Sequence, residues 1–442
     1  MRLIIAILAA KYAVMYIHEK ENWTSFYWNQ EEISSFLDEV CREQGKLYGR
    51  LESIGFENQL MLTAENIVSD IVYSSEIEGV VLNTEEVRSS VATKLGIDTK
   101  SFVAPSHRVD SVVEVTLDAL HNYERALTKD RLCGWQAALF PTGYSSGVPI
   151  ETGRYRTCEE HIVSGRFGHE KVHYVAPSPD RVEAEMEAFL QWFNANLSQS
   201  PIIRSAIAHL WFVSIHPFED GNGRLSRIIA DIFLARGDKS RMRFYNMSSQ
   251  INQSKKEYYC ILETVQRGNG DITQWLVWYI STLKQALLHS DTLLSRVLCK
   301  SLFWVYFAQT PMTQRQKEML NLFLDGYEAK ITSKNWAGLA KCSSDTALRD
   351  IQDLVDKQVL LVDDETVRRK SYSINYAGKK KDVFLARFSH IEVVTEGERT
   401  FIRACTNGTK EVSECLMSLD VERLKKGEVQ PEQLLAKYFS YL

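Results

Sequence analysis

Apolar residues recur every three or four positions along most of this chain, the spacing that places them on one face of an α-helix. The two clearest stretches cover residues 203–213 and 225–233, on either side of a short polar segment. The same spacing recurs over residues 33–47, 62–81, 109–127, 133–139, 179–196 and 272–287. The chain is therefore predicted to be mainly α-helical, with apolar helix faces packed into a shared core.

The helical spacing disappears in segment 157–177. Valines lie toward both ends of this segment, and Gly165 and Gly168 lie between them. β-branched residues on both sides of a glycine-containing turn are typical of a hairpin, so we expect a short β-hairpin here. Segment 141–148, which is rich in Gly and Ser, predicts a loop.

A separate unit is predicted beyond Thr310. Helical patterns are followed there by two strand-like segments, in the order 313–324, 334–340, 344–355, 359–362 and 370–374. This order predicts a winged helix-turn-helix over residues 311–376. The remaining residues contain strand-like segments 383–388 and 391–395 and a helical end at 431–442, and we assign them no function.

The charge of the predicted winged helix argues against DNA binding. Residues 311–376 contain ten Lys or Arg and ten Asp or Glu, and the third helix carries Asp345, Asp350 and Asp353 against Arg349 alone. A helix that enters a DNA groove is usually basic, because phosphate neutralisation supplies much of the affinity. We therefore expect nucleic acid not to be a partner and favour protein docking or formation of a homodimer.

Length and composition set the class of protein. A chain of 442 residues exceeds one ordinary core, so several domains are expected. We divide it into an N-terminal helical region (1–107), a central helical domain (108–290), the winged helix (311–376) and an unassigned C-terminal region (377–442). The net charge of -5 gives no reason to expect a general nucleic-acid binder.

The eight cysteines are scattered and include no CxxC pair. This argues against a zinc site or a disulfide framework, and predicts a reducing, cytoplasmic compartment. Segment 1–14 has a short basic and then apolar run that faintly resembles a signal peptide, although we favour an upstream start codon or a plain terminal helix. No segment approaches the length needed to span a membrane, so no membrane partner is expected.

The two clearest helices meet at a loop. Pro217 disfavours helix at His216 and is expected to end the first helix there. The second helix is expected to begin around Asn222, because asparagine is a good N-cap residue.

The loop and the start of the second helix combine several groups that suit phosphate chemistry. Gly221–Gly223 lets the backbone approach a ligand closely, and free amides at the start of a helix form an anion site. Arg224 and Arg227 add fork-shaped donors for phosphate oxygens. Asp220 is a hard oxygen ligand for Mg²⁺, and His216 accepts protons near neutral pH. Together these groups predict phosphoryl or nucleotidyl transfer.

This stretch resembles the signature of the Fic family, His-x-Phe-x-Asp/Glu-Gly-Asn-Gly-Arg-x-x-Arg, and holds every fixed position from His216 to Arg227. Members typically move AMP from ATP onto a hydroxyl of a target protein. The resemblance implies that His216 is the catalytic base and that Asp220 holds Mg²⁺. The nucleotide-binding positions that it implies are Asp220, Gly221, Asn222, Gly223, Arg224, Leu225, Ser226 and Arg227.

Three further elements resemble parts of the family. Tyr258 and Tyr259 match a tyrosine pair that contacts the nucleotide, and Gln266 takes the place of an amide that is often Asn. Gly153-Arg154-Tyr155-Arg156 resembles the Gly-x-Tyr/Phe-Arg element that precedes the Fic flap, a hairpin that holds the target by strand addition. The positions that we expect in target docking are Glu160, His161, Ile162, Val163 and Ser164.

Ser74, Glu78 and Gly79 match an inhibitory helix found in many Fic proteins, Ser/Thr-x-x-x-Glu-Gly/Asn. The resemblance implies that the Glu78 carboxylate pairs with Arg227 and competes with the γ-phosphate of ATP for that guanidinium. The same glutamate is read as purely structural in the simpler interpretation.

The function predicted from sequence is thus a protein adenylyltransferase that uses Mg-ATP and modifies a Ser, Thr or Tyr hydroxyl of a protein substrate. Two alternatives stay open at this point. One is a Fic enzyme that transfers another group or removes AMP, with Glu78 positioning a water. The other is a nucleotide-sensing regulator that binds DNA through its winged helix.

Overall fold

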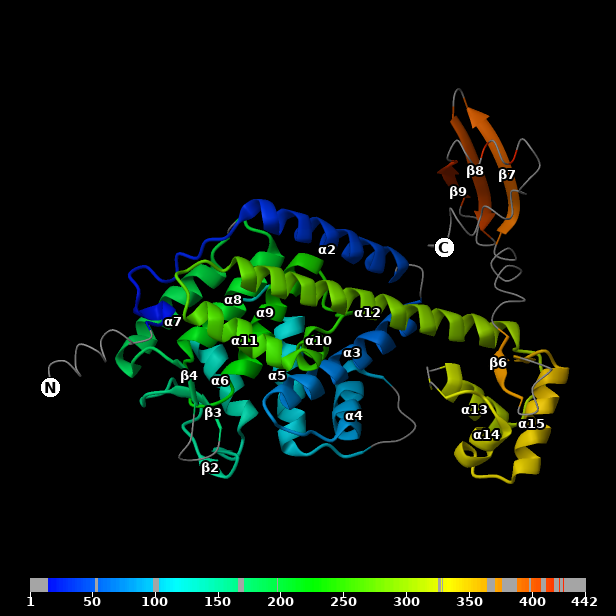
Figure 1. Ribbon diagram of the computed structural model, residues 1–442, viewed down its shortest axis with the longest axis horizontal. Coiled ribbons are helices and arrows are strands. Elements are labelled where there is room, and N and C mark those ends of the chain that lie inside the picture. Colours follow the sequence, from blue (N-terminus) through cyan, green and yellow to red (C-terminus); the bar gives the residue numbers. More distant parts are fainter. Residues whose placement is uncertain are drawn as a thin grey trace. The chain divides into compact units, whose positions relative to one another are not determined.

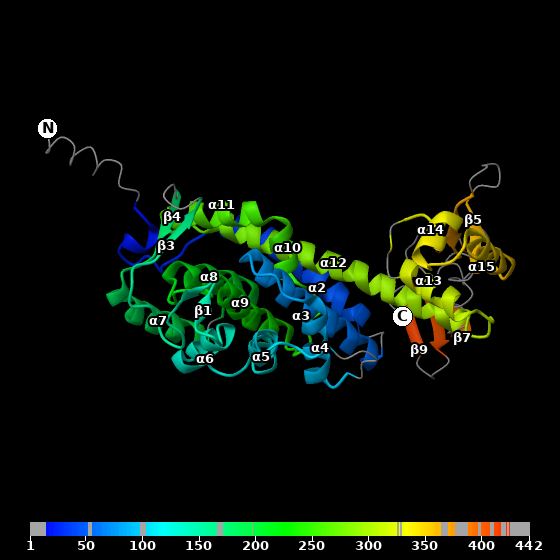
Figure 2. The same ribbon diagram turned by 90° about the horizontal axis from the view of Figure 1, so that it is seen from below.

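The computed structural model describes residues 15–51, 55–97, 103–165, 171–196, 198–324, 327, 329–363, 370–375, 388–396, 399–406, 411–416, 421 and 424. These residues divide into two compact units, one formed by residues up to 48 with 55–290, the other by 49–54 with the residues from 291 onward. Figures 1 and 2 show that helices dominate the first unit, which confirms the predicted mainly α fold.

The helices follow one another as the apolar spacing predicts, with shifted ends. In chain order they are η1 (Ile17–Glu19), α2 (Gln30–Leu51), α3 (Phe56–Ile77), α4 (Thr84–Leu95), α5 (His107–His121), α6 (Lys129–Leu139), α7 (Pro179–Asn194), α8 (Pro201–Ile215), α9 (Asn222–Asp238), α10 (Met247–Gln253), α11 (Lys255–Gln266) and α12 (Thr273–Tyr306). None of the helices in the described residues combines the length and apolarity that a membrane crossing needs.

Helices α8 and α9 form the centre of the first unit (Figure 1). Every residue from Ile202 to Ile215 is buried, and the polar side chains of α8 find partners: Arg204 donates to Phe193 O, and His209 Nε2 lies 2.9 Å from the Tyr258 hydroxyl. Helix α9 packs on α8 and also contacts α3 and α5. The loop between α8 and α9 therefore sits on a rigid base.

The predicted hairpin is confirmed as β3 (His161–Ser164) paired antiparallel with β4 (Lys171–Val175). The predicted loop at 141–148 instead contains a two-stranded ribbon, β1 (Tyr144–Ser145) and β2 (Val148–Pro149). Its turn residues Ser146 and Gly147 both have positive φ, as a two-residue hairpin turn of type I′ requires. Glycine and serine signalled the turn, but the strands are too short to show a period.

The end predicted for the helix over residues 272–287 was wrong. Helix α12 does not stop at residue 287 but continues to Tyr306. The stretch from 273 to 310 contains neither Gly nor Pro, so no helix-breaking residue lies between residue 287 and the observed end at Tyr306.

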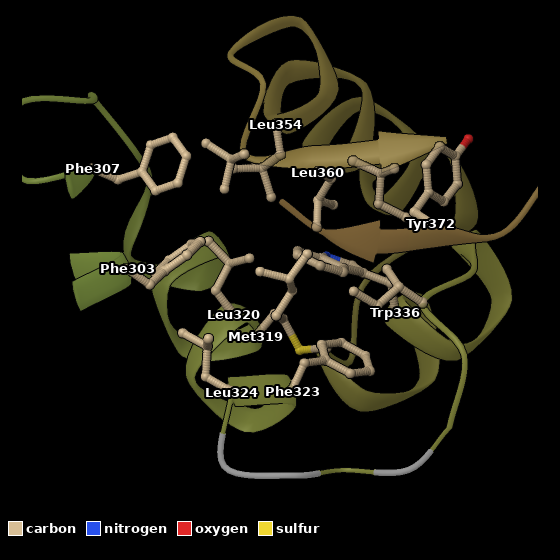
Figure 3. Packing of buried hydrophobic residues seen from close by; sticks show 14 of the residues in the cluster. Phe303, Phe307, Met319, Leu320, Phe323, Leu324, Trp336, Leu354, Leu360 and Tyr372 are labelled. Carbon is tan, nitrogen blue, oxygen red and sulfur yellow. The ribbon is translucent and has the colours of Figure 1, made fainter. Parts of the chain in front are cut away.

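In the second unit, three helices are followed by two antiparallel strands. They are α13 (Gln314–Leu324), α14 (Ser333–Leu339), α15 (Ser344–Asp356), β5 (Leu360–Val362) and β6 (Tyr372–Ile374). Figure 3 shows Trp336 and Leu360 among the apolar side chains that these elements bury together with Phe303 and Phe307 of the preceding segment. This is the order of elements expected for a winged helix-turn-helix, and that assignment stays a prediction.

Two of the three aspartates that make α15 acidic are bound by other side chains of the unit. Asp350 does not face solvent, because it is buried and bound by Arg315, and Asp353 accepts from Gln316 and Lys357. Asp350 is thus occupied in packing α15, whereas Asp345 is exposed and the Asp353 side chain is 43% exposed, so these two still contribute negative charge to the outer face.

Farther along the chain, β7 (Phe388–Glu396), β8 (Arg399–Thr406) and β9 (Glu411–Cys415) form a three-stranded antiparallel sheet in the order β7-β8-β9. The predicted strand at 391–395 lies within β7. The predicted strand at 383–388 lies outside the described residues except for Phe388, and both the helical end at 431–442 and segment 1–14 lie outside them entirely.

Candidate active site

The loop between α8 and α9 is shaped by two residues in the left-handed backbone region. His216 has φ 52° and ends α8, and Gly221 has φ 94° and precedes α9. A left-handed histidine is uncommon, and such a conformation persists only where the surroundings fix it. The N-cap is Gly221, one residue before the position expected. The Asn222 side chain instead holds the loop, accepting from Phe218 N at 3.0 Å and donating to Phe218 O at 2.6 Å.

Backbone carbonyls at the end of α8 fix the orientation of the His216 ring. The backbone N of His216 donates to Phe212 O at 3.0 Å, and its ring Nδ1 lies 3.1 Å from Val213 O. A carbonyl oxygen only accepts, so Nδ1 carries the proton of the neutral ring and Nε2 keeps a free lone pair. Burial lowers the pKa of His216 to about 4, with the neighbouring Arg156 also lowering it. The ring is therefore neutral at pH 7 and able to accept a proton at Nε2.

Arg156 joins the same helix end to the hairpin. Its Nε donates to His216 O at 2.7 Å and its Nη2 to Pro177 O at 2.5 Å, while its backbone N donates to Pro217 O at 2.9 Å. Its Nη1 donates to Cys158 O at 2.8 Å. One buried guanidinium thus binds both ends of the hairpin segment and the backbone of the histidine.

The start of α9 is occupied by the carboxylate of Glu78. Glu78 directly follows α3, and Arg227 Nη2 donates to its Oε1 at 2.8 Å. A methyl group built on Gly223 would overlap this carboxylate, so the carboxylate lies against the backbone of the first turn. Only glycine at position 223 leaves room for an anion there.

Ser74 provides two further acceptors for the Arg227 guanidinium. Its hydroxyl accepts from Arg227 Nε at 2.9 Å, and its carbonyl accepts from Nη2 at 2.8 Å. Nη1 of Arg227 is buried and has no hydrogen-bond partner among the described residues. Burial acts to lower the pKa of Arg227, but Glu78 more than offsets this and raises it. Gly79 has φ 75°, a left-handed turn that ends the segment after α3.

Arg224 is the second buried guanidinium at this helix start. Its Cζ lies 4.8 Å from the centre of the Phe140 ring, and its Nη2 lies 4.0 Å from Asp220 Oδ1. Its Nε is buried without a partner among the described residues. Burial lowers the pKa of Arg224. Two buried arginines with unused donors at one helix start make a site for a multiply charged anion.

Asp220 lies at the edge of this site. Its carboxylate accepts from the Ser145 hydroxyl and, at 2.5 Å, from Gly221 N. No group of three or more His, Cys, Asp or Glu side chains able to hold a metal ion occurs in the described part of the chain. A single carboxylate beside an anion site fits Mg²⁺, which is commonly held by one or two carboxylates together with substrate phosphates.

The remaining residues predicted to bind nucleotide do not share one environment. Leu225 and Ser226 are buried in α9. Tyr258 is buried, and its hydroxyl lies 2.9 Å from His209 Nε2. The Gln266 side-chain amide donates to Ser214 Oγ at 3.2 Å. Tyr259 is exposed on one side, and its hydroxyl donates to Ile77 O at 3.2 Å. Of these, only Tyr259 presents an aromatic face to solvent close to Glu78.

The five residues expected in target docking lie in or beside β3. Glu160 O accepts from Ala176 N, and burial raises the pKa of Glu160 to about 7. His161, Ile162, Val163 and Ser164 form β3, which pairs only with β4 among the described strands. The Ser164 hydroxyl lies 2.5 Å from His173 Nε2. The outer edge of β3 therefore carries free backbone groups that a further strand can pair with.

Sequence reasoning missed several residues that shape this site. Arg156 was noted only as part of a motif, and Tyr174 and Phe140 were not singled out. Their roles depend on contacts between distant segments, for which spacing along the chain gives no signal. For Arg156 the motif itself was the signal, because it placed an arginine directly before the hairpin.

Comparison with known proteins agrees with this geometry. Residues 126–234 match the model of the Fic/DOC family, and residues 16–97 match a domain of unknown function, DUF4172. A protein adenylyltransferase Fic from Nematostella vectensis is 26% identical over 248 residues, covering 54% of this chain and 52% of that protein. One from Culex quinquefasciatus is 29% identical over 210 residues, covering 46% of this chain and 38% of that protein. The chain thus spans about half, or less, of the length of the curated relatives it matches.

Among solved structures, a Fic family protein from Desulfovibrio desulfuricans G20 is similar. It is 20% identical, with a TM-score of 0.47, and the similarity covers 80% of this chain and 99% of that one.

Proposed function

Because residues 126–234 form a Fic/DOC family domain, we propose that this protein transfers AMP from Mg-ATP to a Ser, Thr or Tyr hydroxyl of a target protein. One observation carries the proposal. A carboxylate already sits on the start of α9 against Gly223 and Arg227, beside a histidine whose free nitrogen is Nε2. An anion seat next to a neutral base is the arrangement that nucleotidyl transfer to a hydroxyl needs.

In this proposal His216 Nε2 takes the proton of the target hydroxyl as its oxygen attacks the α-phosphorus of ATP. A P–O bond to the target forms, the bond to the leaving pyrophosphate breaks, and AMP stays on the target. Arg224, Arg227 and the amides of Asn222 and Gly223 would stabilise the charge on the phosphates, whereas the Gly221 amide is bound to Asp220. Asp220 would hold Mg²⁺, which neutralises phosphate charge when bound.

The hairpin β3–β4 would bring the hydroxyl to the base. Its ends are tied to the backbone of His216 and Pro217 through Arg156, so the free edge of β3 has a fixed position relative to the ring. A target segment added to that edge by backbone pairing would be held with little demand on its side chains. Tyr259 would contact adenine, because its ring is exposed on one side close to Glu78.

The same proposal assigns Glu78 an inhibitory role. Its carboxylate occupies Arg227, the group that would otherwise bind the γ-phosphate, and Ser74 fixes the segment that carries it. ATP and Glu78 would then compete for one guanidinium. Productive transfer requires that Glu78 leave Arg227.

Labelling with ATP radiolabelled on the α-phosphate tests this function. We expect Glu78→Gly to increase labelling of itself and of lysate proteins about tenfold or more, because the ion pair blocks a charge-assisted contact worth about 1.5–3 kcal/mol. Glu76→Gly is the matched control, since Glu76 lies in the same last turn with an exposed side chain. Adding His216→Ala to Glu78→Gly should abolish labelling while ATP binding persists. Undiminished labelling in that double variant would exclude His216 as the base.

A further inference from the structure

The segment before α2 lies against the hairpin and the helices that carry the site. Lys20 Nζ donates to Gly268 O at 2.6 Å just past α11, and Trp23 Nε1 donates to Glu185 Oε2 at 3.0 Å on α7. Arg181 of α7 donates to His18 O at 3.1 Å. We call residues Tyr16–Tyr27 the N-terminal arm. It belongs to the stretch that matches a domain of unknown function.

One contact of the arm reaches toward the catalytic histidine. His18 is buried, and its Nδ1 lies 3.0 Å from the hydroxyl of Tyr174 on β4. The Tyr174 hydroxyl in turn lies 2.9 Å from Ser214 O, in the last turn of α8 and two residues before His216. The arm, the hairpin and the end of α8 thus meet in one chain of hydrogen bonds.

The direction of this chain follows from the chemistry of its members. Ser214 O only accepts, so the single proton of the Tyr174 hydroxyl must point to it. The hydroxyl oxygen is then the acceptor for His18, whose Nδ1 must carry a proton. Burial lowers the pKa of His18 to about 4, which is consistent with a neutral ring protonated at Nδ1.

Ser214 O needs such a donor. The last four carbonyls of a helix have no partner within it, and here the C-terminal turn of α8 is buried, so water cannot supply one. Tyr174 satisfies Ser214 O, while Arg156 satisfies His216 O and also contacts Ile215 O. The left-handed backbone of His216 therefore depends on side chains from outside α8.

We propose that His18 is a positioning residue for the transfer reaction. By donating to Tyr174 it directs the Tyr174 hydroxyl onto Ser214 O, and this holds the end of α8 in the conformation that aims His216 Nε2 at the site. The N-terminal arm thereby completes the active site and sets the rate of the chemical step rather than the binding of ATP. This role rests on the proposed adenylyl transfer.

The test uses the full-length chain with Glu78→Gly as the parent. His18→Asn retains a donor in the place of Nδ1, whereas His18→Gln offers one only near the place of Nε2. We expect kcat to stay within about twofold of the parent for His18→Asn and to fall about tenfold for His18→Gln, the loss of one hydrogen bond to a buried group. KM for ATP should stay within about twofold in both, because no contact to the phosphates is lost.

Two further variants separate positioning from general stability. Tyr174→Phe should also lower kcat, and adding His18→Gln to it should cause no further loss, because His18 acts through the tyrosine. Lys20→Met removes another anchor of the arm and should leave kcat unchanged. Equal kcat for His18→Asn and His18→Gln, or additive losses with Tyr174→Phe, would overturn the proposal.

A readout without activity keeps this test separate from the proposed function. Nitrogen-15 NMR of the parent should show a neutral His18 ring with the proton on Nδ1, and Tyr174→Phe should change that signal. A His18 ring protonated on Nε2 alone would overturn the positioning role even if transfer occurs. If His18 of the parent carries its proton on Nδ1 but the parent shows no transfer that depends on His216, then the proposed function has failed. The hydrogen-bond geometry on which the positioning role rests would still stand.

Discussion

Two guanidinium–carboxylate pairs, Arg227–Glu78 in the first unit and Arg315–Asp350 in the second, differ in how fully the carboxylate is hydrogen-bonded. In the second unit Arg315 binds both oxygens of Asp350, at 2.6 Å from Nε and 2.9 Å from Nη2, and Trp336 adds a third donor at 3.4 Å. In the first unit Arg227 makes a single 2.8 Å bond to Glu78. The Glu78 side chain is 27% exposed, whereas that of Asp350 is 8% exposed.

The difference separates a structural pair from an exchangeable one. The Asp350 carboxylate is bound on both oxygens and its departure would break two bonds to Arg315, which is 38% exposed, and leave the buried Trp336 donor without an acceptor. The Glu78 carboxylate is held by one bond and is partly in contact with water, so it can move into solvent, but it leaves Arg227, only 3% exposed, without a charge partner. It also leaves behind a guanidinium with an unused donor, ready for another anion. This contrast supports reading Glu78 as a removable occupant of a phosphate seat.

The largest expected effect concerns the arginine of the exchangeable pair. Replacing Arg227 with Met in the Glu78→Gly background should reduce kcat/KM for transfer at least about a hundredfold, because a preorganised donor to the phosphates is lost. The matched replacement Arg315→Met should leave transfer unchanged. Steady-state labelling kinetics measure both, and an equal loss in the two variants would remove the distinction between the pairs.

The next effect concerns stability. Asp350→Ala should lower the free energy of unfolding of the second unit by about 2 kcal/mol, because it leaves the buried Trp336 donor without its acceptor and removes both bonds from Arg315. Glu78→Ala should cost no more than this, because Arg227, whose side chain is only 3% exposed, loses its charge partner but keeps both bonds to Ser74. Urea denaturation of the two variants and the unsubstituted chain compares them. A larger loss for Glu78→Ala would show that its pair is structural.

The sequence predicted the two helices around the α8–α9 loop better than it predicted the contacts that hold the loop. Apolar spacing located α8 and α9, Pro217 marked the end of α8, and the glycines marked a place for an anion. Spacing could not show that Asn222 ties the loop to Phe218, because that contact depends on the turn itself. Nor could it show that Asp350 points inward. A residue at the boundary between the apolar and polar faces of a helix can be either buried or exposed, and the spacing does not decide which. The length of α12 was missed because an absence of Gly and Pro is a weak signal.

The contacts with the least signal in the sequence are those between distant segments. His18 and Tyr174 are 156 positions apart, and Arg227 and Ser74 are 153 apart. The spacing of residues along the chain gives no indication that the members of either pair lie in contact. For Glu78 and Arg227 a family resemblance replaced that missing signal, whereas for His18 there was none.

The smallest expected effect is a pH dependence. Because burial lowers the pKa of His216 to about 4, the free-base form should dominate from pH 7 down to pH 5. Between pH 7 and pH 6 we expect kcat/KM of Glu78→Gly to change by less than about 20%, whereas a histidine with the usual pKa near 6.5 would lose about threefold as it gains a proton. A threefold loss over this interval would mean that the ring is not desolvated in the free enzyme.

In the proposed mechanism, Glu78 and the terminal phosphate of ATP bind at the same place, which is formed by Arg227 and the start of α9. Calorimetric titration of ATP with Mg²⁺ into the unsubstituted chain, Glu78→Gln and the control Glu76→Gln tests it most directly. We expect Glu78→Gln to bind ATP about tenfold more tightly than the unsubstituted chain, because a charge-assisted competitor is removed. Glu76→Gln should bind ATP as the unsubstituted chain does. Equal affinity in all three proteins would contradict it.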